Sequence, residues 1–263
     1  MPNAFVTTSW DDEARSGLKV AELLERNQLR GTFYVPTGRL GEDSFFSAPD
    51  LRTLRAAGFE IGAHTVSHAI LSDLNPRELG REVSACKAAL QEILGTEIRM
   101  FCYPRGRFNG NVVSAVQQAG YAGARSTQML SSGAAFDRFA MPTTLQAYPH
   151  HRSNYVRNLL RLRAGGTLLK SLPDLVRFED WLQLGKDTFD RVVRNGGVWH
   201  LYGHPWEIEK LGLWPQLAEM LEYVSNRSGV QYVTNGQLLA LVKGEAPAQS
   251  EKLAKTPPQS VVQ

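Results

Sequence analysis

Two short motifs of acidic and histidine residues could bind and use a cation. Asp11 and Asp12 follow the apolar segment 5–10, and His64 and His68 stand four positions apart. One carboxylate and two imidazoles would give a divalent cation three protein ligands and leave positions open for water and a substrate oxygen. The second carboxylate could then take a proton from that water as a general base. The four residues therefore indicate a hydrolytic metal site rather than a closed structural one.

The spacing of the two histidines limits the kind of metal site that is expected. On a helical turn, positions i and i+4 share a face, so the rings of His64 and His68 could meet one ion. A zincin protease would carry glutamate after the first histidine, but Thr65 stands there. Such ligands accept zinc, cobalt, nickel or iron, of which we expect zinc. Each motif also has a simpler interpretation, because acidic residues after a strand often form a loop or helix cap and a histidine pair can be incidental.

The predicted secondary structure places these motifs at the ends of strands. Segments rich in β-branched, aromatic and apolar residues alternate with segments of helical periodicity. The clearest helix spans residues 76–94, with Asn75 as its cap, Pro76 in its first turn and Gly95 as its stop. This alternation predicts an α/β fold, a single-domain distorted (β/α) barrel of seven or eight mostly parallel strands. The predicted strands are residues 5–10, 32–35, 60–64, 99–103, 121–126, 198–202 and 230–234, and further helices are expected near 109–118, 186–194 and 213–223.

In such barrels the chemistry gathers at the carboxyl ends of the strands. The aspartate pair follows the first predicted strand, and His64 closes the third. Tyr103 and Pro104 close the fourth strand, and His204 follows a late one. The topology therefore predicts that these side chains converge on one site.

This ordered series resembles the polysaccharide deacetylases, the NodB-like superfamily of carbohydrate esterase family 4. The resemblance covers about residues 5–205, and its specific part is the HxxxH motif with the upstream aspartate pair. It implies a metal-dependent hydrolase that removes an N-acyl group, typically acetyl, from an amino sugar in a polysaccharide, lipid-linked or nucleotide-linked saccharide. The residue roles that it implies are Asp11 as general base, Asp12, His64 and His68 as metal ligands, and His204 as the acid that protonates the leaving amine.

Residues around Tyr103, Pro104 and Arg105 resemble the third motif of that family. The resemblance implies that this segment holds the oxyanion, with the backbone N–H of Arg105 as a donor. The family commonly carries an arginine two residues before the proline, where this chain has Cys102, so an arginine that would orient the base is missing there. Arg105 or Arg107 is a candidate replacement. The alternative is a Pro-Gly turn that only ends a strand.

Further candidates surround the late predicted strand. His200 is an alternative to His204 as the acid, but its position inside an apolar strand also suits a buried core histidine. Glu207 is an additional candidate site residue. Four aromatic residues could stack on a sugar ring or simply pack in the core, namely Trp181, Trp199, Tyr202 and Trp206.

Two other functions stay open. Relatives of such a fold hydrolyse other non-peptide C–N bonds, which would make the chain an allantoinase-like hydrolase of a cyclic ureide. A non-catalytic carbohydrate-binding protein could also keep the fold, and the missing arginine and a long basic insertion favour that interpretation. Burying like charges without a metal would be costly, which argues against it.

Composition limits the partners and the compartment. The formal charge of the 263 residues is only +3, so no nucleic-acid partner is expected. No apolar run approaches the roughly 20 residues of a membrane-spanning helix. Residues 1–5 lack the pattern of a signal peptide, and Cys86 and Cys102 form no metal motif. We therefore expect a cytoplasmic protein with reduced thiols, and a homo-oligomer is compatible with this composition.

The barrel is expected to span residues 1–243, with a basic insertion at about 139–175. No acidic residue occurs between Phe139 and Pro173, and basic residues from Arg152 to Lys170 are interspersed with leucines. We interpret this segment as an amphipathic helix that lies in solvent or contacts an anionic membrane surface or a phosphate-linked sugar carrier. Residues 244–263 are rich in Pro, Ala, Gln, Ser and Lys, which predicts a disordered tail.

Overall fold

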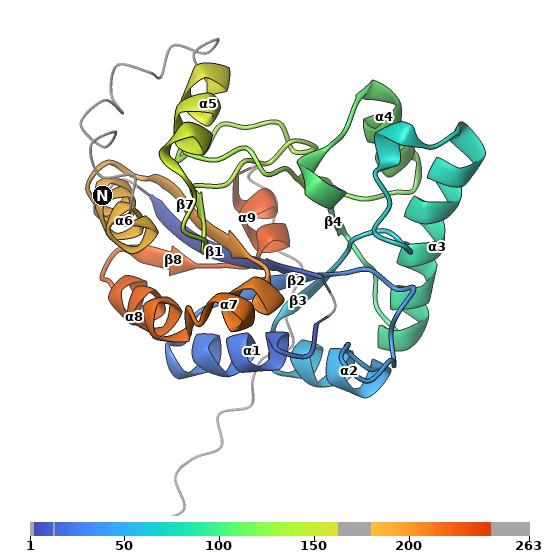
Figure 1. The fold of residues 1–263 in the computed structure, drawn as a ribbon, viewed down its shortest axis with the longest axis horizontal. Helices are drawn as coiled ribbons and strands as arrows, with labels where there is room; N and C mark the ends of the chain where they lie inside the picture. Colours follow the sequence, from blue (N-terminus) through green and yellow to red (C-terminus); the bar gives the residue numbers. More distant parts are fainter. Residues whose placement is uncertain (1–2, 13, 163–179, 243–263) are drawn as a thin grey trace, which may run out of the picture.

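The chain folds into one parallel sheet that curls into a distorted barrel (Figure 1). The computed structural model describes residues 3–12, 14–162 and 180–242. The strand order is β5-β4-β3-β2-β1-β7-β6, with β8 paired to β1, and every pair of these strands is parallel. The predicted barrel of seven or eight mostly parallel strands is confirmed. The strands are β1 (Ala4–Asp11), β2 (Gly31–Val35), β3 (Glu60–Ala63), β4 (Met100–Cys102), β5 (Gly123–Arg125), β6 (Leu145–Gln146), β7 (Gly197–Gly203) and β8 (Val230–Tyr232).

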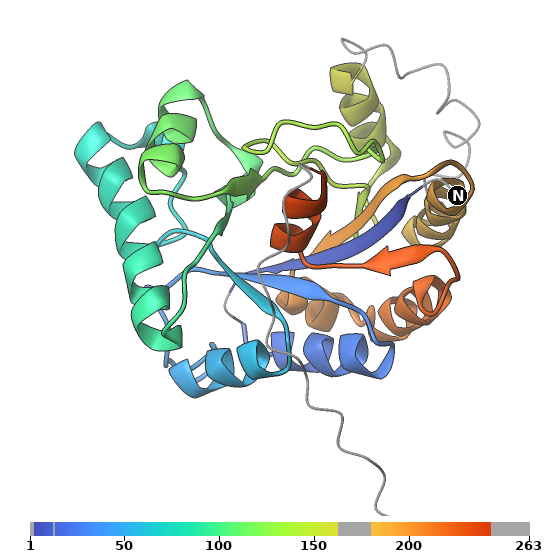
Figure 2. The ribbon, with the colours of Figure 1, turned by 180° about the vertical axis from the view of Figure 1, so that it is seen from behind.

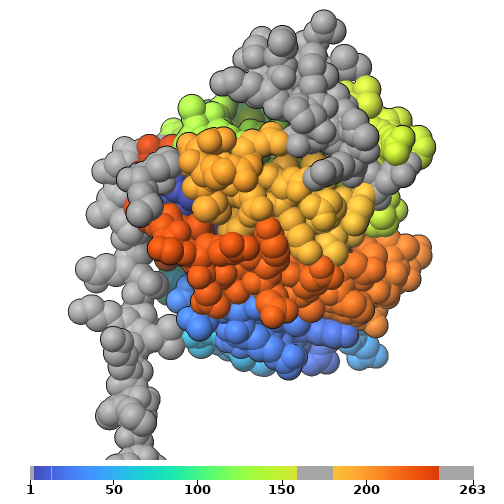
Figure 3. Space-filling view, turned by 90° about the vertical axis from the view of Figure 1, so that its left-hand side faces the viewer, coloured from blue at the N-terminus to red at the C-terminus, as the bar shows by residue number. Residues whose placement is uncertain are grey.

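Helices cover the outside of the sheet. Figure 3 shows one side of this layer, where α6, α8 and α1 lie in successive rows. In the described part of the chain, none of the helices combines the length and the apolar character needed to cross a bilayer. The helices are α1 (Gly17–Arg26), α2 (Ala48–Ala56), α3 (Pro76–Leu94), α4 (Gly110–Gln118), α5 (Arg152–Leu162), α6 (Trp181–Asn195), α7 (Pro205–Leu211), α8 (Trp214–Val224) and α9 (Asn235–Val242), with short 3-10 turns η1 (Leu71–Asp73) and η2 (Pro104–Gly106).

Strand β1 is the centre of the sheet and is buried along its whole length. Its first residues pair with β8 and its last residues with β2, while β7 runs along nearly the whole of its other edge. Figure 2 shows β8 beside β1 from behind. A strand that is hydrogen-bonded on both edges and buried on both faces has little freedom to move. The residues that follow Trp10 are therefore held in a fixed position.

An irregular segment closes the barrel between β5 and β7. Ala124 N–H donates to the Arg138 carbonyl at 2.7 Å, and Met141 N–H donates back to the Ala124 carbonyl at 2.9 Å. Thr144 N–H then donates to the His200 carbonyl at 3.0 Å, and β6 continues this pairing with β7. The sequence predicts the start of this segment to be part of the basic insertion at about 139–175, because a two-residue strand leaves no recognisable pattern. The rest of that insertion, 163–175, and the predicted tail, 244–263, lie outside the described residues.

Helix α3 begins and ends where the sequence predicts. Asn75 accepts hydrogen bonds from the N–H groups of Arg77 and Glu78, and the Glu78 carboxylate accepts from the N–H of Asn75, which makes a capping box. Gly95 ends the helix in the left-handed conformation, at φ 63°. The helix places Glu82 beside the loop that follows β3. The position of α3 therefore affects the conformation of this loop, which belongs to the candidate site.

Replacement of Asn75 by alanine removes both acceptor contacts of the cap. We expect the free energy of unfolding to fall by about 1 kcal/mol. Urea denaturation measures this loss, and Asn75→Asp, which keeps an acceptor oxygen, serves as the matched control. Equal unfolding midpoints for the alanine variant and the wild type would contradict the assigned cap.

Candidate metal centre and active site

The side chains expected to do chemistry lie at one end of the barrel. Asp11 is the last residue of β1, His64 follows β3, Cys102 ends β4 and His204 follows β7. Because all of these strands are parallel, their carboxyl ends face the same way. The parallel topology therefore brings these side chains to the same end of the barrel, where the order of the motifs predicts them.

Asp12, His64 and His68 come together with the spacing of a metal site. Asp12 Oδ1 lies 3.4 Å from His68 Nε2 and 3.9 Å from His64 Nε2. One ligand atom from each of the three residues lies within 4.8 Å of the other two. His64 is buried, whereas the His68 side chain is 34% exposed, so the site opens to solvent on one side. A carboxylate and two imidazoles in this arrangement fit a divalent cation that keeps open positions.

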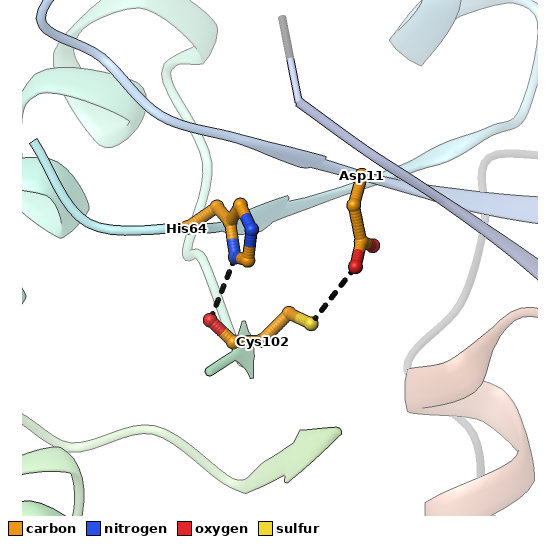
Figure 4. Close-up of side chains that lie close together, drawn as sticks. All are labelled: Asp11, His64 and Cys102. Atoms are coloured by element: carbon orange, nitrogen blue, oxygen red, sulfur yellow. Dashed lines mark hydrogen bonds between the residues drawn. The ribbon is translucent and has the colours of Figure 1, made fainter. Parts of the chain in front are cut away.

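A backbone carbonyl orients the first of these imidazoles. His64 Nδ1 lies 2.8 Å from the Cys102 carbonyl oxygen (Figure 4). Since a carbonyl can only accept, Nδ1 carries the proton and Nε2 keeps a free lone pair toward Asp12. A ring fixed in this way by its second nitrogen is typical of metal-ligating histidines. The orientation therefore supports His64 as a ligand.

The loop from His64 to His68 is not the helical turn considered from the sequence. Thr65 and His68 both adopt positive φ, 71° and 57°, which a helix does not contain. The carboxylate of Glu82 accepts hydrogen bonds from the N–H groups of Val66 and Ser67 at 2.8 and 2.9 Å. A buried carboxylate from α3 thus holds the loop, and the loop, not a helix face, brings the two rings together.

The second aspartate turns out of the strand to reach the histidines. Asp12 has φ 75°, so its side chain leaves the alternation of β1. Its Oδ2 accepts a 2.7 Å hydrogen bond from Trp206 Nε1, which leaves Oδ1 toward the two imidazoles. Burial raises the pKa of the Asp12 carboxyl, but His64, His204 and the Trp206 N–H outweigh this effect and hold the pKa below its ordinary value. Asp12 is therefore ionised, as a metal ligand must be.

The first aspartate points into the barrel beside Cys102. Asp11 is 3% exposed, and its Oδ2 lies 3.3 Å from the Cys102 Sγ, as Figure 4 shows. Its Oδ1 is buried and has no hydrogen-bond partner in the described part of the chain. Burial and the neighbouring Asp11 raise the pKa of the Cys102 thiol, so the thiol keeps its proton and donates it to the carboxylate. An unpartnered carboxylate oxygen next to a metal site is suited to receive a proton from water.

His204 is held by a carboxylate and an amide. Its Nδ1 lies 2.6 Å from Glu207 Oε2, and the Gln146 amide nitrogen lies 2.9 Å from the same oxygen. Burial lowers the pKa of His204, but the hydrogen bond to Glu207 and the charges of Asp11 and Asp12 raise it to about 9. The ring is thus protonated at neutral pH and can act as a proton donor.

The third motif forms a tight turn after β4. Arg105 has φ 56°, and the N–H groups of Gly106 and Arg107 close the turn on the carbonyls of Tyr103 and Pro104. The Tyr103 side chain is fully buried and its hydroxyl donates to the Phe139 carbonyl at 2.9 Å. Tyr103 therefore supports the barrel wall with its side chain.

The other late-strand candidates are buried in the barrel. His200 is 1% exposed, with Nδ1 2.9 Å from an amino group of Arg125 and Nε2 3.1 Å from Ser9 Oγ. Burial and the Arg125 charge lower the pKa of His200 well below its ordinary value, so its ring is neutral. Trp181, Trp199 and Tyr202 are also buried, which agrees with packing, whereas Trp206 is 43% exposed at the mouth of the site.

Three residues near the site carry no motif that could have singled them out. Gln146 Oε1 accepts a hydrogen bond from the Tyr202 hydroxyl at 2.7 Å, and its amide nitrogen contacts His204 and Glu207. Glu82 and Arg125 are buried charged residues on elements that were predicted only as a helix and a strand. The only sequence signal for them is a charged or amide side chain at a position that faces inward.

Fold and site together define a (β/α) barrel with Asp12, His64 and His68, which could hold a metal ion, clustered at the carboxyl ends of its strands. Residues 2–124 match the sequence profile of the polysaccharide deacetylase family. Over these residues, just under half of the chain, the sequence is similar to that of the polysaccharide deacetylases, as its motifs imply. Similar proteins include a chitin deacetylase of Pestalotiopsis sp, 27% identical over 121 residues, which are 46% of this chain and 40% of that protein. YxkH of Bacillus subtilis (strain 168), named after the same family, is 21% identical over 99 residues, 38% and 36% of the two chains. The matches thus span less than half the length of these curated relatives.

Solved structures share the fold. A protein of Mycobacterium smegmatis, described as a polysaccharide deacetylase, superposes with a TM-score of 0.63 at 14% identity and covers 96% of this chain and 95% of its own. The family 4 carbohydrate esterase of Streptomyces lividans gives a TM-score of 0.53 at 18% identity, with 88% and 92% covered. A mutant of a family 4 pseudoenzyme with restored activity gives 0.54 at 16% identity, with 90% and 68% covered.

Substitution of Glu207 by glutamine should lower the pKa of His204 from about 9, because it removes the negative charge that stabilises the protonated ring. NMR titration of the imidazole C–H signals in metal-free protein measures the shift. Glu209→Gln, two residues further along the same helix, is the matched control and should leave the pKa of His204 in place. An unchanged pKa in Glu207→Gln would show that Glu207 does not control the ring.

Proposed function

We propose that this protein is a metal-dependent deacetylase that hydrolyses the N-acyl group, typically acetyl, of an amino sugar in a saccharide. One observation carries the proposal. Asp12, His64 and His68 form a ligand set, and an unpartnered buried oxygen of Asp11 lies at the same end of the barrel. The family match supports hydrolysis of this kind.

In the proposed reaction each residue has one role. Asp12, His64 and His68 would hold a divalent cation, with zinc as first candidate and cobalt, nickel or iron as others, and that ion would supply Lewis-acid polarisation of the amide carbonyl. Asp11 takes the proton of the attacking water through its free oxygen. The backbone N–H of Arg105 stabilises the oxyanion, and His204 gives its proton to the leaving nitrogen. The products are a free amine and acetate, so one water is consumed and no other reactant is needed.

The substrate is proposed to lie against Trp206. Its indole is 43% exposed while its N–H is bonded to Asp12, so one ring face is available beside the metal site. Aromatic faces pack well against the apolar faces of sugar rings. The Pestalotiopsis relative is named for chitin, which makes N-acetylglucosamine oligomers the first substrates to assay, before lipid-linked and nucleotide-linked sugars.

We expect the zinc-loaded protein to release acetate from N-acetylated chitooligosaccharides. Asp11→Asn should still bind zinc but lose turnover by about 100- to 10,000-fold, because a general base is removed while the ligand set stays. Asp12→Asn should lose zinc affinity as well. Acetate release and isothermal titration with Zn²⁺ measure the two properties separately.

The outcomes of this assay decide between the functions. Ring opening of allantoin without acetate release from any saccharide would favour a ureide hydrolase. Saccharide binding with no hydrolysis of either substrate class would favour a non-catalytic relative. Zinc binding that survives loss of Asp12, His64 and His68 together would refute the assigned metal centre.

Trp206 is expected to have two separate roles. Its N–H orients Asp12, and its ring face packs against the sugar. Trp206→Phe keeps an aromatic face but removes the N–H that holds Asp12 Oδ2, so zinc affinity should fall by about 10-fold while KM changes little. Trp206→Ala should raise KM in addition. Titration calorimetry and steady-state kinetics test this, and equal zinc affinity in wild type and Trp206→Phe would rule out the role of the N–H.

A further inference from the structure

A buried arginine lies next to Cys102 on the inner face of the barrel. Arg125 of β5 is the register partner of Cys102 of β4, and only 3% of it is exposed. Residues paired in register on neighbouring parallel strands project from the same face of a sheet. Since the Cys102 thiol points at Asp11, Arg125 enters the barrel interior on the same side of the wall.

The contacts of this guanidinium are all with neutral groups. One amino group lies 2.9 Å from His200 Nδ1 and donates to Asn235 Oδ1 at 2.6 Å, while the other donates to the Pro142 carbonyl. Arg125 Nε is buried and has no partner. Within the described ranges, no carboxylate lies within ion-pair distance of Arg125. Its charge is therefore not neutralised by a direct contact.

Two neutral side chains connect Arg125 to the strand that ends in Asp11. Because arginine only donates, His200 Nδ1 accepts and His200 Nε2 donates to Ser9 Oγ at 3.1 Å. Asn235 Oδ1 also accepts from Thr7 Oγ1 at 2.9 Å. Thr7, Ser9 and Asp11 alternate along β1 and share its inner face. The arginine thus anchors the row of side chains that leads to the general base.

The charge of Arg125 is best matched by Asp11. Burial lowers the pKa of Arg125 to about 10, which still leaves it protonated at neutral pH, and Asp11 and Glu60 are among the nearby acids that raise it. Glu60 has other partners, because its carboxylate accepts from the Thr32 hydroxyl at 2.7 Å and the Gly236 N–H at 2.9 Å. Among the described residues, Asp11 has only the weak thiol donor of Cys102, and its other oxygen has no hydrogen-bond partner there. A buried cation and a buried, poorly bonded anion offset each other even without contact.

We propose that Arg125 is a positioning residue for Asp11: it anchors the inner face of β1 and supplies the buried positive charge that keeps the Asp11 carboxylate turned into the site. The inference rests on the proposed function, because it assigns Arg125 a role in the step that Asp11 performs. Arg105 and Arg107 are both exposed on the turn after β4, so neither lies inside the barrel.

The test compares four zinc-loaded variants with the wild type on N-acetylated chitopentaose. Arg125→Met removes the charge at similar volume, and Arg125→Lys keeps a buried cation. The double variant Cys102→Arg with Arg125→Ala returns a guanidinium from the neighbouring strand in the same register. Glu60→Gln is the matched control for the other nearby carboxylate. Readouts are kcat, KM, zinc affinity by calorimetry and the midpoint of thermal unfolding.

We expect Arg125→Met to lower kcat roughly 10- to 100-fold while KM and zinc affinity keep their wild-type values. Arg125→Lys and the double variant should recover part of kcat, and Glu60→Gln should keep wild-type turnover. If Arg125→Met does not fold, the two variants that keep a cation carry the test, and both should turn over.

Three results overturn the inference. Folded Arg125→Met with wild-type kcat would show that Asp11 does not need the charge. Loss of kcat that neither lysine nor the relocated arginine restores would assign Arg125 to packing alone. Absence of acetate release by the wild type on every N-acetylated saccharide would instead refute the proposed function and, with it, the step that Arg125 serves.

Discussion

The site depends on one backbone event, the turn of the chain out of β1 after Asp11. On a regular strand, consecutive side chains project to opposite faces, so two adjacent aspartates cannot both serve one pocket. The positive φ of Asp12 ends this alternation, and the pairing of β1 with three other strands fixes where the turn occurs. One carboxylate consequently stays inside the barrel while its neighbour reaches the imidazoles. The left-handed conformation of Asp12 is energetically unfavourable, and the hydrogen-bonded strand before it holds the residue in this conformation.

Much of the fold follows from the sequence, because alternating strands and helices leave few topologies. Helix α3 was predictable to the residue, since its cap, proline and terminal glycine are all local signals. Strand β6 was not, because two residues carry no periodicity and its pairing with β7 is a tertiary contact. The same contrast between local signals and tertiary contacts applies to the candidate metal site. His64 and His68 are visible as a spaced pair, but the loop that joins them depends on Glu82, which only the packing of α3 brings near.

The interior of this barrel is unusually polar around the site, and its polar groups are organised in layers. Asp11, Cys102 and His64 form the layer at the open end, and Ser9 and His200 lie deeper along the strands, where the guanidinium of Arg125, the register partner of Cys102, reaches His200. Most of these groups are satisfied by one another, as buried polar groups must be. The exceptions are an oxygen of Asp11 and a nitrogen of Arg125. Three expectations from the sequence stay predictions. These are the cytoplasmic location, the contact of the basic helix with a membrane surface, and self-association.

The hydrogen bond that orients His64 is accepted by a main-chain oxygen and not by a side chain. The carbonyl of residue 102 fixes the tautomer of the ring, and every amino acid offers that same carbonyl. The side chain at this position therefore takes no part in the hydrogen bond that orients His64. Its thiol instead contacts Asp11, so a substitution of residue 102 would change the surroundings of the Asp11 carboxylate and leave the carbonyl that faces His64 in the chain.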